Sequence, residues 1–78
     1  MMIAILYVEI AEGSPSAADQ LEHVSLANCK QLVSHLAANE VIVRLECNDP
    51  ESLNQAISQD FAGIEGVTRI TTCIVRKS

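Results

Sequence analysis

The segment 48–75, which reads NDPESLNQAISQDFAGIEGVTRITTCIV, most constrains what this 78-residue chain can fold into. Asp49 and Pro50 predict a helix start, because aspartate caps free amides and proline fits the first helical position. Apolar residues then recur at helical spacing, at Leu53, Ala56, Ile57 and Phe61. Gly66 suits a tight turn, and the run of β-branched residues at 68–76 predicts a strand. The segment therefore predicts a helix, a tight turn and a strand in succession.

Three further elements follow from local patterns. Residues 3–10 (IAILYVEI) are nearly all apolar, which is typical of a strand with both faces covered. Apolar residues at helical spacing predict a helix over 15–26, with Pro15 in its first turn. Residues 41–47 alternate, which predicts a strand with one apolar face made by Val41, Val43, Leu45 and Cys47.

The apolar residues of 27–39 fit both the spacing of a helix and the alternation of a strand. Leu26, Cys29, Leu32, Val33 and Leu36 match a helix, and the alanines and leucines of this stretch favour one. The alternation of Cys29, Gln31, Val33 and His35 matches a strand equally well, and a strand here would complete a four-stranded sheet. We predict a strand over 30–35 and keep the helix as the alternative.

The resulting order, β-α-β-β-α-β, predicts one α+β domain over 1–78 with a ferredoxin-like fold. Its four-stranded antiparallel sheet would have both helices on one face. Hydrophobic residues make up 49% of the chain and aromatic residues 3%, so aliphatic side chains must build the core. That apolar fraction is high for so small a domain. We therefore expect a homodimer or higher homo-oligomer, in which two sheets pack face to face as in dimeric α/β barrels.

Charge and the N-terminus exclude several partners. The net charge is −5, and the five lysines and arginines are scattered, whereas nucleic-acid binding needs a clustered positive surface. The apolar N-terminal stretch is too short for a membrane span and lacks a signal-peptide pattern. The sequence therefore predicts a cytoplasmic protein without direct nucleic-acid or membrane contact.

The three cysteines, Cys29, Cys47 and Cys73, are odd in number and far apart. No C-x-x-C pair exists, so neither a zinc site nor a redox motif is indicated. We expect three free, buried thiols in a reducing compartment.

No catalytic pattern is visible. His23 and His35 have no nucleophile or acid at triad spacing, and the acidic residues form no spaced pair typical of glycoside hydrolysis or metal binding. The glycines form no phosphate loop. We therefore expect a protein that is not an enzyme and needs no metal or cofactor; an enzyme of the dimeric α+β-barrel kind is a weaker alternative.

Glu9 stands inside an apolar strand. A charged residue there predicts that Glu9 lies at a sheet edge, lies at an interface, or pairs with a basic residue such as Arg44 or Arg69.

The chain resembles the ligand-binding domain of the leucine-responsive regulator/AsnC family, in its stand-alone form without a DNA-binding domain. Three motifs support this resemblance. They are Val8-Glu9 before the Glu12-Gly13 turn, and Asp-x-Glu-x-Leu at Asp49, Glu51 and Leu53. The third is the family's closing Ile-Pro-Gly-Val and Thr-x-Thr-x-Ile-Val, which here reads Ile-Glu-Gly-Val at 64–67 and Ile-Thr-Thr-Cys-Ile-Val at 70–75. The resemblance implies a ferredoxin-like, oligomeric domain. It would sense a small effector, such as an amino acid, and act in transcriptional regulation through a partner regulator.

The same resemblance implies a ligand site near the turn at 36–40. The family usually has a Gly-x-Tyr-Asp-like signature there, whereas this chain has Leu-Ala-Ala-Asn-Glu. Glu40 would take a ligand ammonium, and backbone amides or Ser34 would take a carboxylate. The implied ligand-binding residues are Ser34, His35, Leu36, Ala38, Asn39, Glu40 and Thr72.

The chain also resembles cytoplasmic maturation chaperones of the NapD type. The shared pattern is Cys-x-x-x-Val-Ser, Ile-Val, Glu and Asp-x-Glu-x-Leu, matched by Cys29, Val33, Ser34, Ile42, Val43, Glu46, Asp49, Glu51 and Leu53. These chaperones share the ferredoxin-like fold and bind a twin-arginine signal peptide on the sheet. This resemblance implies an adaptor that captures a peptide, and the acidic charge of the chain suits such a partner.

Overall fold

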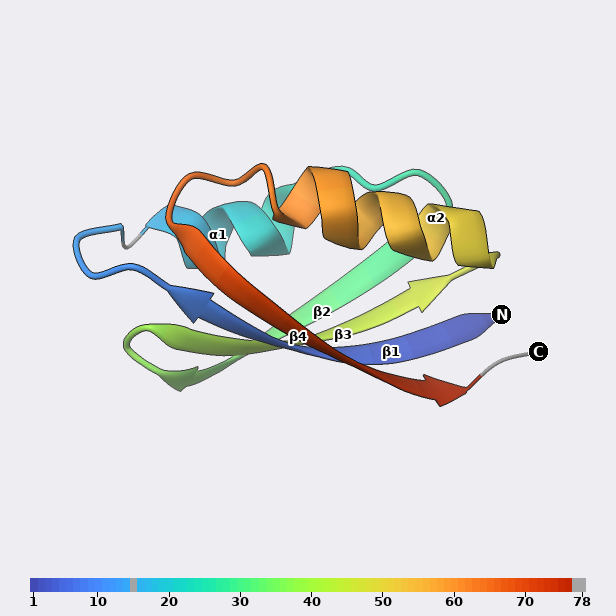
Figure 1. The fold of residues 1–78 in the computed structure, drawn as a ribbon, viewed down its shortest axis with the longest axis horizontal. Helices are drawn as coiled ribbons and strands as arrows, with labels where there is room; N and C mark the ends of the chain where they lie inside the picture. The colour runs from blue at the N-terminus through green and yellow to red at the C-terminus, as the bar shows by residue number, and fades with distance from the viewer. Residues whose placement is uncertain (15, 77–78) are drawn as a thin grey trace.

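A computed structural model describes residues 1–14 and 16–76. The elements in chain order are β1 (Met2–Ile10), α1 (Ser16–His23), β2 (Cys29–Ala37), β3 (Glu40–Cys47), α2 (Pro50–Gln55), the π-helix η1 (Ala56–Phe61) and β4 (Val67–Arg76). The strands form one antiparallel sheet in the order β2-β3-β1-β4, and the helices lie together on one side of it (Figure 1). This arrangement confirms the predicted ferredoxin-like βαββαβ fold.

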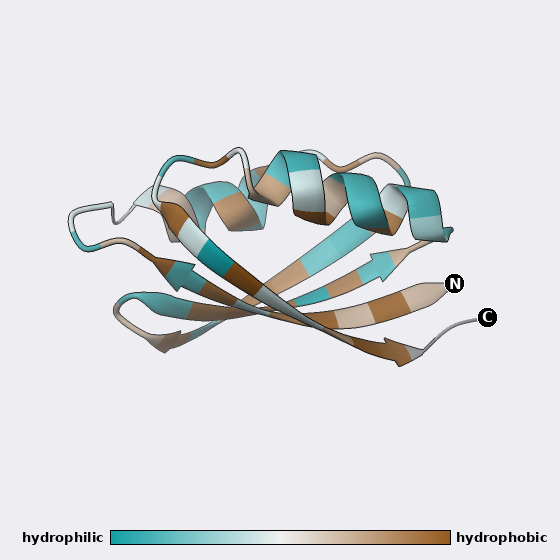
Figure 2. Cartoon of the chain, viewed as in Figure 1, coloured by the Kyte–Doolittle hydropathy of each residue, from teal (hydrophilic) through white to brown (hydrophobic). Residues whose placement is uncertain are grey.

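The core lies between the sheet and the helices. Alternate residues of β1 and β3 face the helices and are buried, while hydrophilic residues lie along the outward side of α2 (Figure 2). Phe61, at the end of η1, is fully buried and is the single phenylalanine in the chain. Aliphatic residues supply nearly all the rest of the core: Met2, Ala4, Leu6, Val8, Ile10, Ala17, Leu21, Val41, Val43, Leu45, Leu53, Ala56 and Ile64.

The ambiguous stretch is a strand, so the helix alternative for residues 27–39 is wrong. β2 pairs with β3 from Cys29 opposite Cys47 to Ala37 opposite Glu40, with a register shift between His35 and Ala37. The strand is longer at both ends than the predicted 30–35. Helix propensity differs by only a few tenths of a kcal/mol per residue, so a ladder of backbone hydrogen bonds to β3 readily overrides it.

The first helix is shorter than predicted. It ends at His23 instead of residue 26, and Pro15, the predicted first-turn residue, lies outside the described residues. The side-chain amide of Gln31 on β2 donates hydrogen bonds to the carbonyl oxygens of Leu21 (3.3 Å) and Val24 (2.5 Å). These bonds satisfy carbonyls that a further helical turn would otherwise use.

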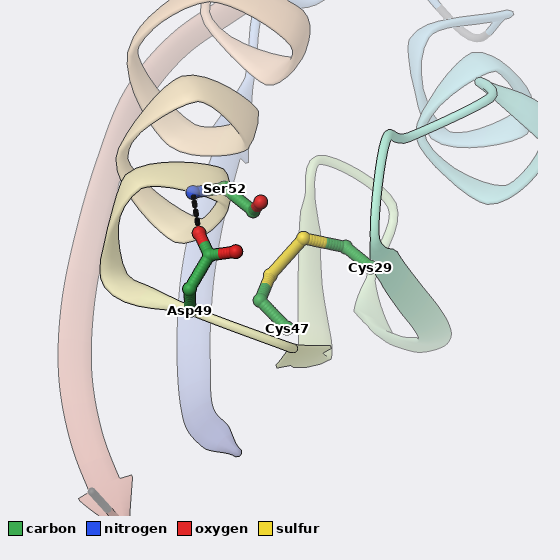
Figure 3. Close-up of a disulfide and its surroundings, with 4 residues drawn as sticks. All are labelled: Cys29, Cys47, Asp49 and Ser52. Atoms are coloured by element: carbon green, nitrogen blue, oxygen red, sulfur yellow. Dashed lines mark hydrogen bonds between the residues drawn. A yellow bond between two sulfur atoms is a disulfide. The ribbon is translucent and has the colours of Figure 1, made fainter.

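The segment that begins at Asp49 folds as its sequence predicts. The Asp49 carboxylate accepts a hydrogen bond from the Ser52 amide (2.7 Å), which caps α2 (Figure 3). The helix continues through η1 to Phe61. Gly66 has φ +101°, and its carbonyl accepts the Ala11 amide at 2.7 Å, so the turn before β4 is tied to the end of β1.

The cysteine prediction is wrong in two respects. Cys29 and Cys47 form a disulfide between β2 and β3 (Figure 3). Cys73 is free, as expected, but it is exposed on β4 instead of buried. The sequence separation of 18 residues conceals the pairing, because only the register of the β2–β3 hairpin places the two cysteines directly opposite each other. Within the described residues, no helix is long and apolar enough to span a membrane.

Candidate functional site

Within residues 1–14 and 16–76, no element covers the face of the sheet that points away from the helices, as Figure 1 shows. On β1, Ala4, Leu6 and Val8 point to the helices and are fully buried, whereas Ile5, Tyr7 and Glu9 point the other way and are half-buried. A single chain therefore covers only one face of β1, although the sequence predicted cover on both. We call this surface the uncovered face; it comprises Ile5, Tyr7, Glu9, Leu32, Ser34, Glu40, Ile42, Arg44, Arg69, Thr71 and Cys73.

The middle of the uncovered face places the apolar residues Ile5, Ile42 and Leu32 among the polar residues Ser34, Arg44 and Thr71. Strand register places Ile42 between Ser34 and Tyr7 in one row. It places Ile5 between Arg44 and Cys73 in the next row, where Leu32 lies beyond Arg44. Leu32 is 66% exposed, which is unusual for a leucine on a strand.

One end of the uncovered face is acidic. Glu40 on β3 lies directly opposite Glu9 on β1, an arrangement of like charges that destabilises a sheet. Arg69 on β4 lies on the other side of Glu9, with 3.8 Å between its Nε and the Glu9 carboxylate. The Tyr7 hydroxyl donates a hydrogen bond to the Glu40 carboxylate. That bond, with the loss of hydration and the negative charge nearby, raises the pKa of Tyr7 to about 12.

The predicted pairing of Glu9 with a basic residue is thus confirmed for Arg69. The other arginine considered, Arg44, lies 3.5 Å from the carboxylate of Glu46 instead. Both ion pairs are at least one-third exposed, so neither adds much stability, and both are free to rearrange around an incoming charge.

The seven ligand-binding residues implied by the sequence do not converge on one place. Ser34 and Glu40 lie on the uncovered face. Ala38 and Asn39 form the β2–β3 turn, where the Asn39 carbonyl accepts the Ile10 amide (2.8 Å). Leu36 lies beside the register shift of β2 and is 60% exposed.

The other two residues lie at opposite edges of the sheet. On β2, His35 pairs with Val41 of β3. On β4, Thr72 pairs with Leu6 of β1. Both Val41 and Leu6 point toward the helices. Two strands separate β2 from β4. His35 and Thr72 therefore cannot contact one small ligand within a single chain.

A shallow depression of about 310 Å³ lies beside the β2–β3 turn. Its walls are Ile10, Ala11, Gly13, Ser14, Ala18, Ala38 and Asn39. None of these seven described residues is charged, so they offer no carboxylate for an amino-acid ammonium group. Glu40 is engaged with Tyr7 on the uncovered face instead.

The apolar residues of the uncovered face were not predicted as site residues. Ile5, Tyr7 and Ile42 occupy alternate positions opposite the core-facing residues of β1 and β3. That alternation is visible in the sequence, but in β1 both sets are apolar, so the pattern does not show which set the helices cover. Leu32 was not predicted on this face because residues 27–39 fitted a helix as well as a strand.

A second cluster lies on α1, where one ligand atom from each of Asp19, Glu22 and His23 falls within 4.8 Å of the others. All three residues are exposed, which is common for surface acids that hold no metal. His23 contacts the Asp19 carbonyl at 2.9 Å and its carboxylate at 3.3 Å, and these contacts raise the pKa of His23. The cluster gives no reason to assign catalysis.

Comparison with solved structures shows where this fold recurs. The Tat proofreading chaperone NapD of E. coli is 25% identical, with a TM-score of 0.71; the match covers 97% of this chain and 78% of that one. TTHA0845 from Thermus thermophilus is 16% identical with a TM-score of 0.71, and the match covers 100% of this chain and 96% of that one. The hypothetical protein PHS023 from Pyrococcus horikoshii is 18% identical with a TM-score of 0.70, with 100% and 93% covered.

No protein-family model and no curated protein matches the chain. The likeness to the Thermus and Pyrococcus proteins shows the ferredoxin-like fold alone. None of the three structures is described as a leucine-responsive regulator, so that resemblance stays a prediction.

Proposed function

We propose that this protein is a non-enzymatic chaperone or adaptor that captures a basic, partly apolar peptide, such as a twin-arginine signal peptide, on the uncovered face. The observation behind this proposal is that Glu9 and Glu40 border exposed and half-buried apolar side chains on one uncovered sheet surface. The likeness to NapD, a Tat proofreading chaperone, supports it.

The acidic end and the apolar residues of the uncovered face both suit such a peptide. Guanidinium groups form bidentate, charge-assisted hydrogen bonds with carboxylates, and Glu9 and Glu40 present two carboxylates side by side. An approaching cation also relieves the repulsion between them. The apolar segment of the peptide would pack on Ile5, Leu32 and Ile42, next to the acidic end. The net charge of −5 attracts such a peptide from a distance.

Binding of a fluorescent peptide, followed by anisotropy, tests the proposal. The peptide contains two adjacent arginines followed by an apolar segment, and the control peptide has glutamine at both arginine positions. We expect saturable binding of the arginine peptide that weakens with added salt, because exposed charges are screened. Equal affinity for both peptides, or no saturation with either, would contradict the proposal.

Charge variants locate the basic part of the peptide. The double change Glu9→Gln and Glu40→Gln is expected to weaken binding by about tenfold or more, as each charge-assisted bond contributes roughly 1–3 kcal/mol. The control, Glu22→Gln with Asp19→Asn, removes the same charge from the exposed side of α1. If both double variants bind alike, the peptide is attracted only by net charge and the assigned face is wrong.

A variant of Leu32 tests where the apolar segment of the peptide binds. Leu32→Ser should weaken binding several-fold, because it removes an exposed apolar contact from the uncovered face. Ile74→Ser is the matched control: Ile74 is 41% exposed, but it lies opposite Ala4, in register with the helix-covered side.

A ligand-sensing homo-oligomer is the second candidate, and the exposed Leu32 on the uncovered face favours it because a second copy would cover this residue. Two sheets would then meet through the same face that we assign to the peptide. Light scattering at rising concentration separates the two. A dimer that persists when peptide is added, together with thermal stabilisation by one of the common amino acids, would favour the sensor over the adaptor.

A further inference from the structure

We propose that the Cys29–Cys47 disulfide is a site of reversible thiol–disulfide exchange that holds the edge strand β2 in place and releases it on reduction. This inference concerns the cross-link itself and does not depend on the proposed peptide binding. It rests on where the two sulfurs lie and on how weakly the rest of β2 is held.

Cys29 and Cys47 face each other at the open end of the β2–β3 hairpin, with 4.1 Å between their Cα atoms. This short separation is typical of a directly opposed pair that exchanges no backbone hydrogen bonds. The neighbouring pair does exchange one, from the Asn48 amide to the Asn28 carbonyl (3.0 Å). The disulfide therefore closes the ladder near its end, where strands otherwise separate most easily.

Little else fixes β2 to the domain. None of its nine side chains is fully buried, and the cluster of buried core residues includes none of them. Cys29 and Val33 only pack against the margin of that cluster. Apart from the backbone ladder to β3, the described contacts of β2 include the two hydrogen bonds from Gln31 to the end of α1.

The two cysteine residues differ in exposure. Cys47 is only 1% exposed, whereas Cys29 is half-buried on the outermost strand and follows the exposed residues Ala27 and Asn28. Figure 3 shows the disulfide beside the start of α2. Exchange requires a thiolate to reach one sulfur of the disulfide. The accessible target is Cys29, and Cys47 is the leaving group.

The chemistry balances with a thiol reductant. A thiolate of a small thiol attacks Cys29 Sγ, which forms a mixed disulfide with Cys29 and releases Cys47 as a thiolate that takes up a proton. A second thiolate then attacks the sulfur of the small thiol, so that Cys29 leaves as a thiolate and is protonated. The protein gains two electrons and two protons, and the two reductant thiols become one disulfide. A dithiol completes both steps within one molecule.

The reduced protein should keep its core. A buried cysteine behaves as a small apolar residue, so Cys47 remains compatible with its site under α2. β2 would instead lose the cross-link near its N-terminal end while β1, β3 and the helices stay packed. The outcome is local opening of one edge strand, which carries Leu32 and Leu36.

The test uses the full chain with Cys73→Ser, which leaves Cys29 and Cys47 as its two cysteines. The protein is equilibrated without denaturant in buffers of varied reduced and oxidised glutathione, quenched with acid and alkylated with a heavy maleimide. We expect a reversible change between no and two alkylated thiols per chain. A disulfide that never forms under excess oxidised glutathione, or that resists reduction until urea unfolds the protein, would overturn the proposal.

Amide hydrogen exchange of the two forms gives the second measurement. Reduction should accelerate exchange at least about tenfold in β2 and in the facing end of β3, and leave β1 and β4 unchanged. The variant with Cys29→Ala, Cys47→Ala and Cys73→Ser should exchange like the reduced form in either buffer. Uniform acceleration across the sheet, or none in β2, would refute a local release.

Discussion

The Tyr7 hydroxyl on β1 donates a hydrogen bond to the Glu40 carboxylate on β3, and so joins the two middle strands across the uncovered face. The acceptor is an anion, so it favours the protonated phenol and raises the pKa of Tyr7 to about 12 from its ordinary 10.0. Tyr7 is the single tyrosine and there is no tryptophan, so ultraviolet absorbance reports this phenol directly.

We expect alkaline titration to show Tyr7 ionising near pH 12. An unfolded tyrosine loses its proton at lower pH, so this contribution to stability is fully present below pH 10 and is lost as the pH rises through about 12. Glu40→Gln should return the Tyr7 pKa toward 10.0, whereas Glu46→Gln on β3 should not. A Tyr7 pKa that ignores Glu40→Gln would contradict the hydrogen bond.

Gly66 combines a positive φ with a close approach to Ser14, so its position requires glycine. Its φ of +101° is strained for other residues, and an added Cβ would lie 2.5 Å from the Ser14 Cβ. Gly66→Ala should lower the free energy of unfolding by about 3 kcal/mol, measured by urea denaturation, because strain and overlap add together.

The matched control is Gly13→Ala, where φ is +85° but nothing lies within 4 Å of an added Cβ. Only backbone strain remains there, so a smaller loss of roughly 1 kcal/mol is expected. Ser14→Gly should restore part of the stability of Gly66→Ala and none of that of Gly13→Ala. Equal losses at both glycines would argue against the close approach to Ser14.

The Asp49 cap makes the stability of α2 depend on pH in the acidic range. Its carboxylate accepts the Ser52 amide at 2.7 Å, and this bond lowers the pKa of Asp49 below the ordinary 3.8. The contribution is therefore present above pH 3.8 and is lost as the pH falls through the lower folded pKa.

We expect Asp49→Ala to lower the Tm by about 5 °C at neutral pH, measured by circular dichroism. Asp49→Ser keeps an oxygen that can cap the helix but cannot titrate in this range. It should retain most of the Tm at neutral pH and show a weaker loss of stability in acid. An unchanged Tm in the alanine variant would show that the cap is not formed.

Gln31 connects β2 to the end of α1. Gln31→Met keeps the length of the side chain and removes the donors to the Leu21 and Val24 carbonyls. We expect a loss of about 1 kcal/mol in the free energy of unfolding and faster amide exchange in the last turn of α1. Gln55→Met, on the exposed side of α2, is the control and should change stability little. A Gln31→Met variant as stable as the control would remove the explanation for where α1 ends.

Local signals predicted β3, α2 and β4 well, because each is specified by neighbours in sequence. The alternation of Val41, Val43 and Leu45 gives the buried face of β3, and Asp49 caps α2 wherever the helix packs. β2 could not be predicted in the same way, since Leu32 and Leu36 suit a helix period as well as a strand. Its ladder with β3 decides between them, and this ladder pairs residues up to 18 positions apart, which is beyond the reach of local periodicity.

The candidate site was less predictable than the fold. Glu40 and Ser34 were expected and lie on the uncovered face, but Thr72 and His35 fall at opposite edges, because sheet order is not contained in local patterns. Tyr7 was missed for a related reason: in a strand whose two faces are both apolar, the sequence does not say which face the helices will take. Leu32 was missed because residues 27–39 fit a helix as well as a strand.

The sequence by itself determined the elements other than 29–37, the aliphatic core and the cap and turn around 49–66, because propensity, capping and periodicity act over a few residues. Only the tertiary structure decided that 29–37 is an edge strand, that Cys29 meets Cys47, and that Tyr7, Glu9 and Glu40 share a face left uncovered. These features depend on strand register, and a shift of one residue would move every side chain to the opposite face.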